Sequence, residues 1–250
     1  MGTSVAVIGA TGRMGSLALR LIEEAPDLEL HAAVGSRDPL DAMAGADVVF
    51  DVTVPGVSQK VVEHAIGLGI DVVVGTSGWS ADRIVGVQRL VAATPGVGVI
   101  IAPNFSLGSV LASSLAALAS RFFDSIEIVE AHHAGKVDSP SGTAVRTAEL
   151  ISAARAGIGP VSAPHWDQRA RGQQVASVPI HSLRLNGVVA KQEVILGGTG
   201  ETVTITHDTV SSAAYEAGIL LALRSVGSTE GVVVGLESLL DLFPSAGPDA

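Results

Sequence analysis

The first hundred residues alternate short runs of Val and Ile with segments of helical periodicity. The apolar runs show no polar alternation, which indicates strands buried on both faces, as in a parallel sheet covered by helices. Strands are predicted at Ser4–Ile8, Leu28–Val34, Val48–Val54, Val72–Val74 and Val97–Ala102, with helices near Met14–Glu24, Ser58–Gly67 and Ala81–Ala92. This alternation predicts a Rossmann-type α/β domain with a doubly wound parallel sheet.

The pattern changes after Asn104. Helices are predicted over Leu107–Arg121 and Ser141–Arg155, with a strand at Ser125–His133 between them and a polar loop, residues 157–176, after them. Three runs with a polar/apolar period of two follow the loop: His181–Leu185, Gln192–Leu196 and Glu201–His207. A period of two indicates strands with one covered face, so we expect a second, α+β domain with an open mixed sheet.

The end of the chain is expected to return to the first domain. A helix is predicted near Ser211–Arg224, and the segment Val232–Phe243 is expected to pack on the first sheet. We therefore assign residues 1–106 and 215–250 to one domain and residues 107–214 to the other.

A glycine-rich turn joins the first predicted strand to the first predicted helix. It reads Gly9-Ala10-Thr11-Gly12-Arg13-Met14-Gly15. Glycines at this spacing allow a tight turn and a close backbone approach to a pyrophosphate, and the helix N-terminus supplies N–H donors. The turn therefore predicts a dinucleotide site; the alternative is a turn with only a structural role.

The end of the second strand bears on the choice of dinucleotide. NAD-binding domains carry an acidic residue there for the ribose 2′-hydroxyl. This chain has Gly35, Ser36 and Arg37, and its first carboxylate is Asp38, which could replace the missing acidic residue and allow use of both cofactors if the turn brings it inward. A hydroxyl and a guanidinium suit a 2′-phosphate better, so the sequence predicts a preference for NADPH, with NADH as a second cofactor. The alternative is an arginine on a surface turn.

Two further loops follow later strands of the first domain. Their residues are Gly75-Thr76-Ser77-Gly78 and Ala102-Pro103-Asn104-Phe105. Ligands of open α/β sheets bind at the carboxyl ends of parallel strands. We therefore expect both loops to line the nicotinamide end of the dinucleotide site.

Titratable groups are concentrated between Glu130 and Ala144. His132, His133 and Lys136 lie within five residues of one another. Strand alternation places Glu130 and His132 on one face and His133 on the other. Ser141, Gly142 and Thr143 then begin a helix whose free N–H groups can bind a carboxylate. The segment thus combines a proton donor with an anion site; packing or capping roles for the histidines are the alternative.

Composition narrows the classes of partner. The 250 residues include 15 Lys and Arg against 25 Asp and Glu, for a net charge of −10. An acidic chain whose only lysines are Lys60, Lys136 and Lys191 is poorly suited to nucleic acid or an anionic membrane. The chain has no cysteine, which excludes disulfides, zinc–thiolate sites and a thiol nucleophile. Charged residues are only 16%, so part of the apolar surface is expected to lie against another subunit.

Two segments bear on localisation. The N-terminus has no basic region ahead of its apolar run and is predicted as a strand rather than a signal peptide. Residues 90–120 carry no charge, but Pro95, Pro103 and several glycines interrupt any membrane-spanning helix. We expect a cytoplasmic protein.

The run from Glu130 to Ala144 resembles the signature of the 4-hydroxy-tetrahydrodipicolinate reductase (dihydrodipicolinate reductase) family. Its pattern is E-x-H-H-x-x-K-x-D-x-P-S-G-T-A. The segments G-A-T-G-R-M-G, V-V-G-T-S-G, A-P-N-F-S and G-E-T-V-T-I-T-H-D are also similar to family segments and occur in family order. The resemblance implies an NAD(P)H-dependent reductase of the diaminopimelate route to lysine.

The resemblance also implies roles for individual residues. His132 would be the proton donor and Lys136 the second catalytic group. His133, Ser141, Gly142 and Thr143 would bind the substrate's carboxylates. The cofactor residues would be Gly9, Ala10, Thr11, Gly12, Arg13, Met14, Gly75, Thr76, Ser77, Ala102, Pro103, Asn104 and Phe105, with Ser36 and Arg37 added from the strand-end argument above. The first domain would then bind the dinucleotide, and the second would bind substrate and form the oligomer.

The implied reaction is the reduction of an unsaturated ring that bears two carboxylates. Reduced nicotinamide would deliver hydride to C4, and His132 or a water that it holds would protonate C3. No metal is expected, because hydride and proton complete the reduction. The family resemblance also implies a homotetramer assembled through the second domain's sheet.

Two other functions are compatible with parts of the sequence. A short-chain dehydrogenase shares a glycine-rich turn but needs a Tyr with a Lys four residues later; the only tyrosine is Tyr215, and residue 219 is Ile. A non-catalytic NADP-binding sensor would share the fold, but nothing would require it to keep His132, Lys136 and Ser141 together.

Overall fold

The computed structural model describes residues 2–240 and residue 242, and divides the chain into two compact units. One unit runs to Phe105 and resumes at Tyr215; the other is Ser106–Ala214. The predicted segment Val232–Phe243 is described only at residues 232–240 and 242. The rest of it, and the remainder of the proposed domain up to residue 250, lie outside the described residues. Each unit is described separately below.

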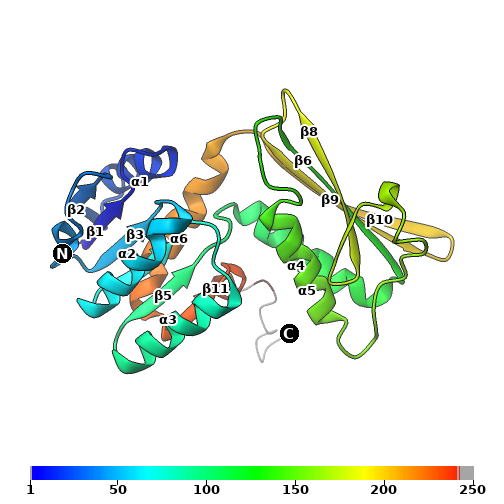
Figure 1. Ribbon diagram of the computed structural model, residues 1–250. Helices are drawn as coiled ribbons and strands as arrows, with labels where there is room; N and C mark the ends of the chain where they lie inside the picture. The colour runs from blue at the N-terminus through cyan, green and yellow to red at the C-terminus, as the bar shows by residue number, and fades with distance from the viewer. Residues whose placement is uncertain (1, 241, 243–250) are drawn as a thin grey trace, which may run out of the picture. The chain divides into compact units, whose positions relative to one another are not determined.

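The first unit is built on a six-stranded parallel sheet with the order β11-β5-β4-β3-β1-β2. Its strands are β1 (Thr3–Ile8), β2 (Leu28–Val34), β3 (Val48–Asp51), β4 (Asp71–Val74), β5 (Gly98–Ile101) and β11 (Gly231–Val234). Its helices are α1 (Arg13–Glu24), α2 (Pro55–Gly67), α3 (Ala81–Ala93) and α6 (Glu216–Ser225). The predicted Rossmann-type fold class is confirmed (Figure 1).

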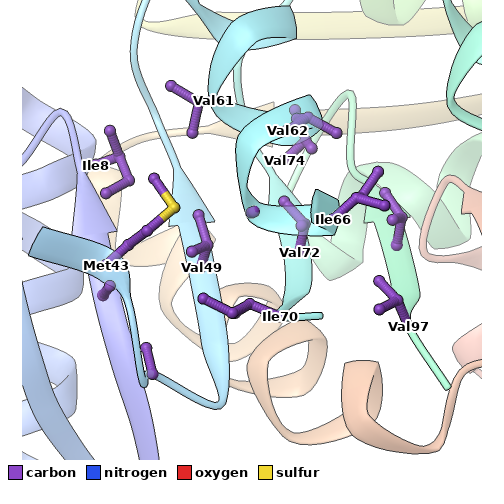
Figure 2. Packing of buried hydrophobic residues seen from close by; sticks show 14 of the residues in the cluster. Ile8, Met43, Val49, Val61, Val62, Ile66, Ile70, Val72, Val74 and Val97 are labelled. Atoms are coloured by element: carbon purple, nitrogen blue, oxygen red, sulfur yellow. The ribbon is translucent and has the colours of Figure 1, made fainter. Parts of the chain in front are cut away.

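Apolar side chains between the helices and the sheet form the core of this unit. Val62 and Ile66 of α2 lie over Val72 and Val74 of β4 (Figure 2). Val72 and Val74 are fully buried, as expected for a central strand of a covered parallel sheet. The Val/Ile-rich runs of the sequence therefore form strands because both of their faces pack against helices.

Several predicted boundaries of the first unit were wrong. The third strand ends at Asp51 rather than at residue 54, because Pro55 begins α2 three residues earlier than expected. Proline suits this first helical position because its missing N–H needs no partner there. The predicted helix Ser211–Arg224 is a short 3-10 turn at Ser212–Tyr215 followed by α6.

The second unit is built on a five-stranded mixed sheet with the order β10-β9-β6-β8-β7. Its strands are β6 (Ser125–His133), β7 (Gln173–Val175), β8 (Val178–Leu185), β9 (Ala190–Gly198) and β10 (Glu201–Thr209), with helices α4 (Leu107–Ala119) and α5 (Gly142–Ala154). Strands β6 and β8 pair parallel, whereas the other neighbours pair antiparallel. Strand β7 lies in the stretch predicted to be a loop.

The two helices of the second unit cover one face of its sheet. Ile128, Ile180 and Leu196 from three strands pack with Ala148 and Ile151 of α5 in one buried cluster. The opposite face leaves Leu183 and Leu185 of β8 about half exposed. The prediction of a mixed sheet with one covered face is confirmed. Among the described residues, no helix is long and apolar enough to cross a membrane.

Two glycines in helices of the first unit predict opposite effects on stability. A Cβ at Gly218 of α6 would lie 2.8 Å from the carbonyl carbon of Phe105, whereas a Cβ at the exposed Gly86 of α3 would meet nothing within 4 Å. We expect Gly218→Ala to destabilise the fold by about 1–3 kcal/mol through overpacking. Gly86→Ala should stabilise it by about 0.5–1 kcal/mol through helix propensity.

Calorimetric melting of both variants checks this pair. A Gly218→Ala protein that melts as high as the unmutated chain would show that α6 does not pack as closely on Phe105 as described.

Candidate functional site

The glycine-rich turn of the first unit has the geometry that an anion site requires. Gly9 has a φ of 92°, a backbone conformation that is costly for any residue with a side chain. Gly12 is the N-cap of α1 and offers no capping side chain, so the helix begins with uncapped N–H groups. A Cβ at Gly15 would lie 2.7 Å from the Ala10 Cα, so α1 can approach the turn only because residue 15 is glycine. The turn therefore fits a pyrophosphate.

A second turn closes the end of β2. The Asp38 N–H donates to the Gly35 carbonyl at 3.3 Å, and the Gly35 N–H donates to Asp38 Oδ2 at 2.8 Å. Ser36 and Arg37 lie between them and are exposed. Within the described part of the chain, Arg37 makes no hydrogen bond or ion pair, so its guanidinium is available to an anion.

The structure brings together the two loops predicted from β4 and β5. A Cβ at Gly75 would lie 2.6 Å from Cε2 of Phe105, so the Phe105 ring rests directly on the Gly75 backbone. Thr76 is buried, and its hydroxyl lies 3.5 Å from the Asp51 carbonyl oxygen. The residues from Gly75 to Ser77 and from Ala102 to Phe105 therefore lie at one edge of the sheet.

A buried carboxylate that the sequence analysis missed fixes this edge. Asp51 at the end of β3 is fully buried and accepts hydrogen bonds from the Thr53 N–H at 3.1 Å, the Thr53 hydroxyl at 2.6 Å and the Ser58 hydroxyl. The Trp79 indole N–H donates to the same Ser58 hydroxyl at 3.2 Å. Asp51 thus ties the loop after β4 to the start of α2. A charged residue within the otherwise apolar run at residues 48–52 was the available signal.

In the second unit, the side chain of Glu130 is fully buried on β6 and makes hydrogen bonds to groups from several segments. Its Oε2 lies 2.6 Å from Nδ1 of His132, and its Oε1 accepts a hydrogen bond from the Ser141 N–H at 3.2 Å. Arg184 of β8 makes a paired contact, with Nη1 at 2.9 Å from Oε2 and Nη2 at 3.0 Å from Oε1. Such paired contacts between a guanidinium and a carboxylate are the strong form of this hydrogen bond.

Burial and charge set the protonation of this cluster. Burial alone would raise the pKa of Glu130, but hydrogen bonds from Arg184, Ser182 and His132 outweigh it and lower the pKa. Burial lowers the pKa of His132, and the hydrogen bond to Glu130 offsets only part of that shift. The nearby charges of Lys136 and Arg184 lower the His132 pKa further. The arrangement is an ionised carboxylate that orients an imidazole through Nδ1.

The remaining residues predicted for the substrate site lie at the end of β6 and in the segment that leads into α5. Lys136 Nζ pairs with Asp138 Oδ1 at 2.8 Å, and Arg184 Nη2 donates to the Asp138 carbonyl at 2.6 Å. Ser141 is the N-cap of α5, and its hydroxyl accepts from the Ala144 N–H at 3.2 Å. Gly142 and Thr143 follow as the first residues of that helix. His133 is exposed, and its carbonyl accepts the Lys136 N–H at 3.0 Å. Within the described residues, no hydrogen bond or ion pair joins its side chain to this cluster.

Arg184 is the residue of this cluster that the sequence analysis missed. It lies opposite His132 in the parallel pairing of β6 with β8, although 52 positions separate the two in the chain. In the structure Arg184 lies on the same face of β8 as the buried Ile180, whereas the apolar Leu183 and Leu185 of the same strand lie on the opposite face. The partner strand and its register, however, are not encoded locally.

Comparisons with known proteins cover nearly the whole chain. The family model for the dihydrodipicolinate reductase N-terminus matches residues 3–105, and the model for the dihydrodipicolinate reductase C-terminus matches residues 108–240. A 4-hydroxy-tetrahydrodipicolinate reductase of Clavibacter michiganensis subsp. michiganensis is 62% identical, over 97% of this chain and 87% of its own length. One of Streptomyces griseus subsp. griseus is 48% identical, over 95% of this chain and 98% of its own.

Solved structures agree with these matches. A dipicolinate-bound dihydrodipicolinate reductase from Paenisporosarcina sp. TG-14 has a TM-score of 0.81 at 28% identity, and the match covers 96% of this chain and 100% of that one. The NAD complex of GenD2 from gentamicin A biosynthesis has a TM-score of 0.60 at 15% identity, over 97% of this chain and 88% of that one, and shows a shared fold alone.

The electrostatics of the cluster predict how His132 titrates. In the free protein we expect its NMR titration midpoint below the ordinary histidine pKa of about 6.5, because burial disfavours the imidazolium. Glu130→Gln should move the midpoint lower still, because it removes the charge that stabilises the imidazolium. The missing resonance of a His132→Ala variant assigns the signal. A midpoint that rises in Glu130→Gln would contradict the described pairing.

Proposed function

The chain belongs to the dihydrodipicolinate reductase family, and from that membership we propose that it reduces 4-hydroxy-tetrahydrodipicolinate to tetrahydrodipicolinate with NAD(P)H. The substrate is a small dicarboxylate, and the reaction belongs to the diaminopimelate route to lysine. The observation that carries the proposal is the contact of Glu130 with both the His132 imidazole and the N–H that begins α5. One buried carboxylate thereby holds a proton donor beside an anion site.

In this proposal the second unit binds the substrate. The helix N-terminus at Ser141, Gly142 and Thr143 binds one carboxylate through backbone N–H groups. Lys136 supplies a positive charge that stabilises negative charge developing on the ring, and His133 contributes a further polar contact. Because Nδ1 of His132 is engaged by Glu130, Nε2 is the nitrogen left for the substrate. Nε2 carries a proton when the ring is imidazolium, the form that the Glu130 carboxylate favours, and it passes that proton to C3 directly or through a water that it holds.

The first unit binds the dinucleotide, which supplies the hydride when bound. Residues of the glycine-rich turn from Gly9 to Met14 hold the pyrophosphate. The two adjoining loops, Gly75–Ser77 and 102–105, bind the nicotinamide end. We propose that Ser36 and Arg37 face the 2′-phosphate, so that NADPH is preferred and NADH is also used. We further propose that the protein acts in the cytoplasm.

A coupled assay tests this function. A synthase makes the unstable substrate in the cuvette, and the absorbance of NADPH follows its reduction. Steady oxidation of NADPH that depends on the synthase supports the proposal. Dinucleotide binding without any turnover would overturn it and indicate a sensor.

His132→Ala should lower kcat by about 10²–10⁴, the usual contribution of a positioned general acid. The dissociation constant of the dinucleotide should hardly change, because His132 belongs to the second unit. Steady-state kinetics and equilibrium titration of the dinucleotide measure the two effects. His165→Asn is a matched control, since the φ of His165 is 56° and asparagine tolerates that region. A near-normal kcat in His132→Ala would exclude His132 as the proton donor.

The cofactor preference should depend on Arg37. We expect about tenfold higher kcat/KM with NADPH, because a hydrogen bond to a charged group contributes roughly 1.5–3 kcal/mol and this site is exposed. Arg37→Ala should weaken NADPH while NADH stays nearly unchanged, and Ser36→Asp should favour NADH. Equal kcat/KM for the two cofactors in the unmutated enzyme would show that these residues do not set the choice.

We propose a homotetramer that pairs through strands near residues 181–208. The half-exposed Leu183 and Leu185, on the uncovered face of the sheet, support it. The low content of charged residues, 16%, points the same way. Light scattering at micromolar concentration should give four times the mass of one chain, and a stable monomer would defeat the proposal.

A further inference from the structure

Residue 35 has no side chain, yet a carboxylate lies where its side chain would be. A Cβ built on Gly35 would lie 3.3 Å from Asp38 Oδ2 and 3.5 Å from Cγ2 of Thr11. The Asp38 carboxylate and the glycine-rich turn therefore both border the point where a side chain at the end of β2 would begin. That is the position from which dinucleotide-binding domains present an acidic residue to the ribose.

The turn holds the Asp38 carboxylate there by one of its two oxygens. Oδ2 accepts the Gly35 N–H at 2.8 Å, and the backbone closes the same turn through the Asp38 N–H and the Gly35 carbonyl at 3.3 Å. Within residues 2–240 and 242, Oδ1 has no hydrogen-bond partner. A carboxylate oxygen has two lone pairs, so Oδ1 can accept from a hydroxyl without breaking the turn.

We propose that Asp38 is a specificity-determining residue that accepts a hydrogen bond from the ribose 2′-hydroxyl of NADH. The inference rests on the dinucleotide site proposed above. A tight turn thus places the Asp38 carboxylate where an acidic residue at position 35 would otherwise present one. Arg37, one residue earlier, faces the 2′-phosphate of NADPH. The same turn thus carries one side chain that contacts NADPH, Arg37, and one that contacts NADH, Asp38.

The two contacts oppose each other in a defined way. The Asp38 carboxylate favours a ribose hydroxyl and repels a 2′-phosphate, whereas the Arg37 guanidinium does the reverse. Both side chains are exposed, so solvent and salt reduce both effects. The preference for NADPH is therefore moderate while Asp38 is present and becomes strong when Asp38 is removed.

Binding of the two dinucleotides without turnover tests the proposal. Calorimetric titration gives dissociation constants for NADH and NADPH, and for ADP-ribose and its 2′-phosphate as probes without the nicotinamide. In Asp38→Ala we expect NADH and ADP-ribose to bind about tenfold more weakly, since a hydrogen bond to a charged group is lost. NADPH and the phosphorylated probe should bind as well as before or better.

A double variant distinguishes the carboxylate's role from its part in the fold. Gly35 does not have a positive φ, so aspartate is accommodated there once Asp38 no longer fills the space. Gly35→Asp combined with Asp38→Ala should restore NADH binding to within about threefold of the unmutated protein. Asp41→Ala is the matched control, because Asp41 is a nearby exposed aspartate that pairs with His64. The Asp41→Ala variant should bind NADH and NADPH with the dissociation constants of the unmutated protein.

The result that would overturn the proposal is an Asp38→Ala protein whose NADH affinity stays within about twofold of the unmutated chain. Failure of the double variant to regain NADH binding, with its melting temperature unchanged, would overturn it as well. Binding of neither cofactor to the unmutated chain would overturn both this inference and the proposed dinucleotide site. Normal binding without reductase turnover would overturn the proposed function and leave the Asp38 result to be decided by the titrations.

Discussion

The buried carboxylate of Glu130 is the interaction on which the second unit's site depends. An unpaired charge in a protein interior is costly, so each oxygen must find donors. Arg184, His132 and the Ser141 N–H supply them from β8, β6 and the start of α5. Satisfying one buried charge therefore brings three separate chain segments into a fixed arrangement. The proposed proton donor and the proposed anion site are two parts of that arrangement.

The first unit satisfies its buried carboxylate with neutral donors. Asp51 is also fully buried, but its partners are the hydroxyls of Thr53 and Ser58 and a backbone N–H. Within the described residues, Asp51 has no cationic partner. The difference suits the proposed ligands. Hydrogen bonds from neutral groups are enough to order loops around a dinucleotide, whereas a dicarboxylate is attracted by the positive charges near His132, those of Arg184 and Lys136.

Local signals explain which parts of this structure were predictable. The glycine-rich turn and the start of α5 were found because backbone conformation and helix capping depend on a few adjacent residues. Arg184 was missed because its place beside His132 depends on which strands pair and in what register. The position of Asp38 was undecided from sequence, because the turn that brings its carboxylate back to Gly35 depends on the exact backbone path.

A double-mutant cycle on kcat tests most directly whether Glu130 acts on the reaction through His132. The kcat values of Glu130→Gln, His132→Ala and the double variant are compared. Each kcat is calculated per folded protein, whose concentration is measured by dinucleotide binding. Glu130 also holds the start of α5, and loss of that contact should raise the KM of the substrate. If the effect of Glu130 on kcat passes through His132, the double variant has a kcat no lower than that of His132→Ala alone, within about threefold. Losses that multiply in the double variant would contradict the claim, because Glu130 would then act on the reaction independently of His132.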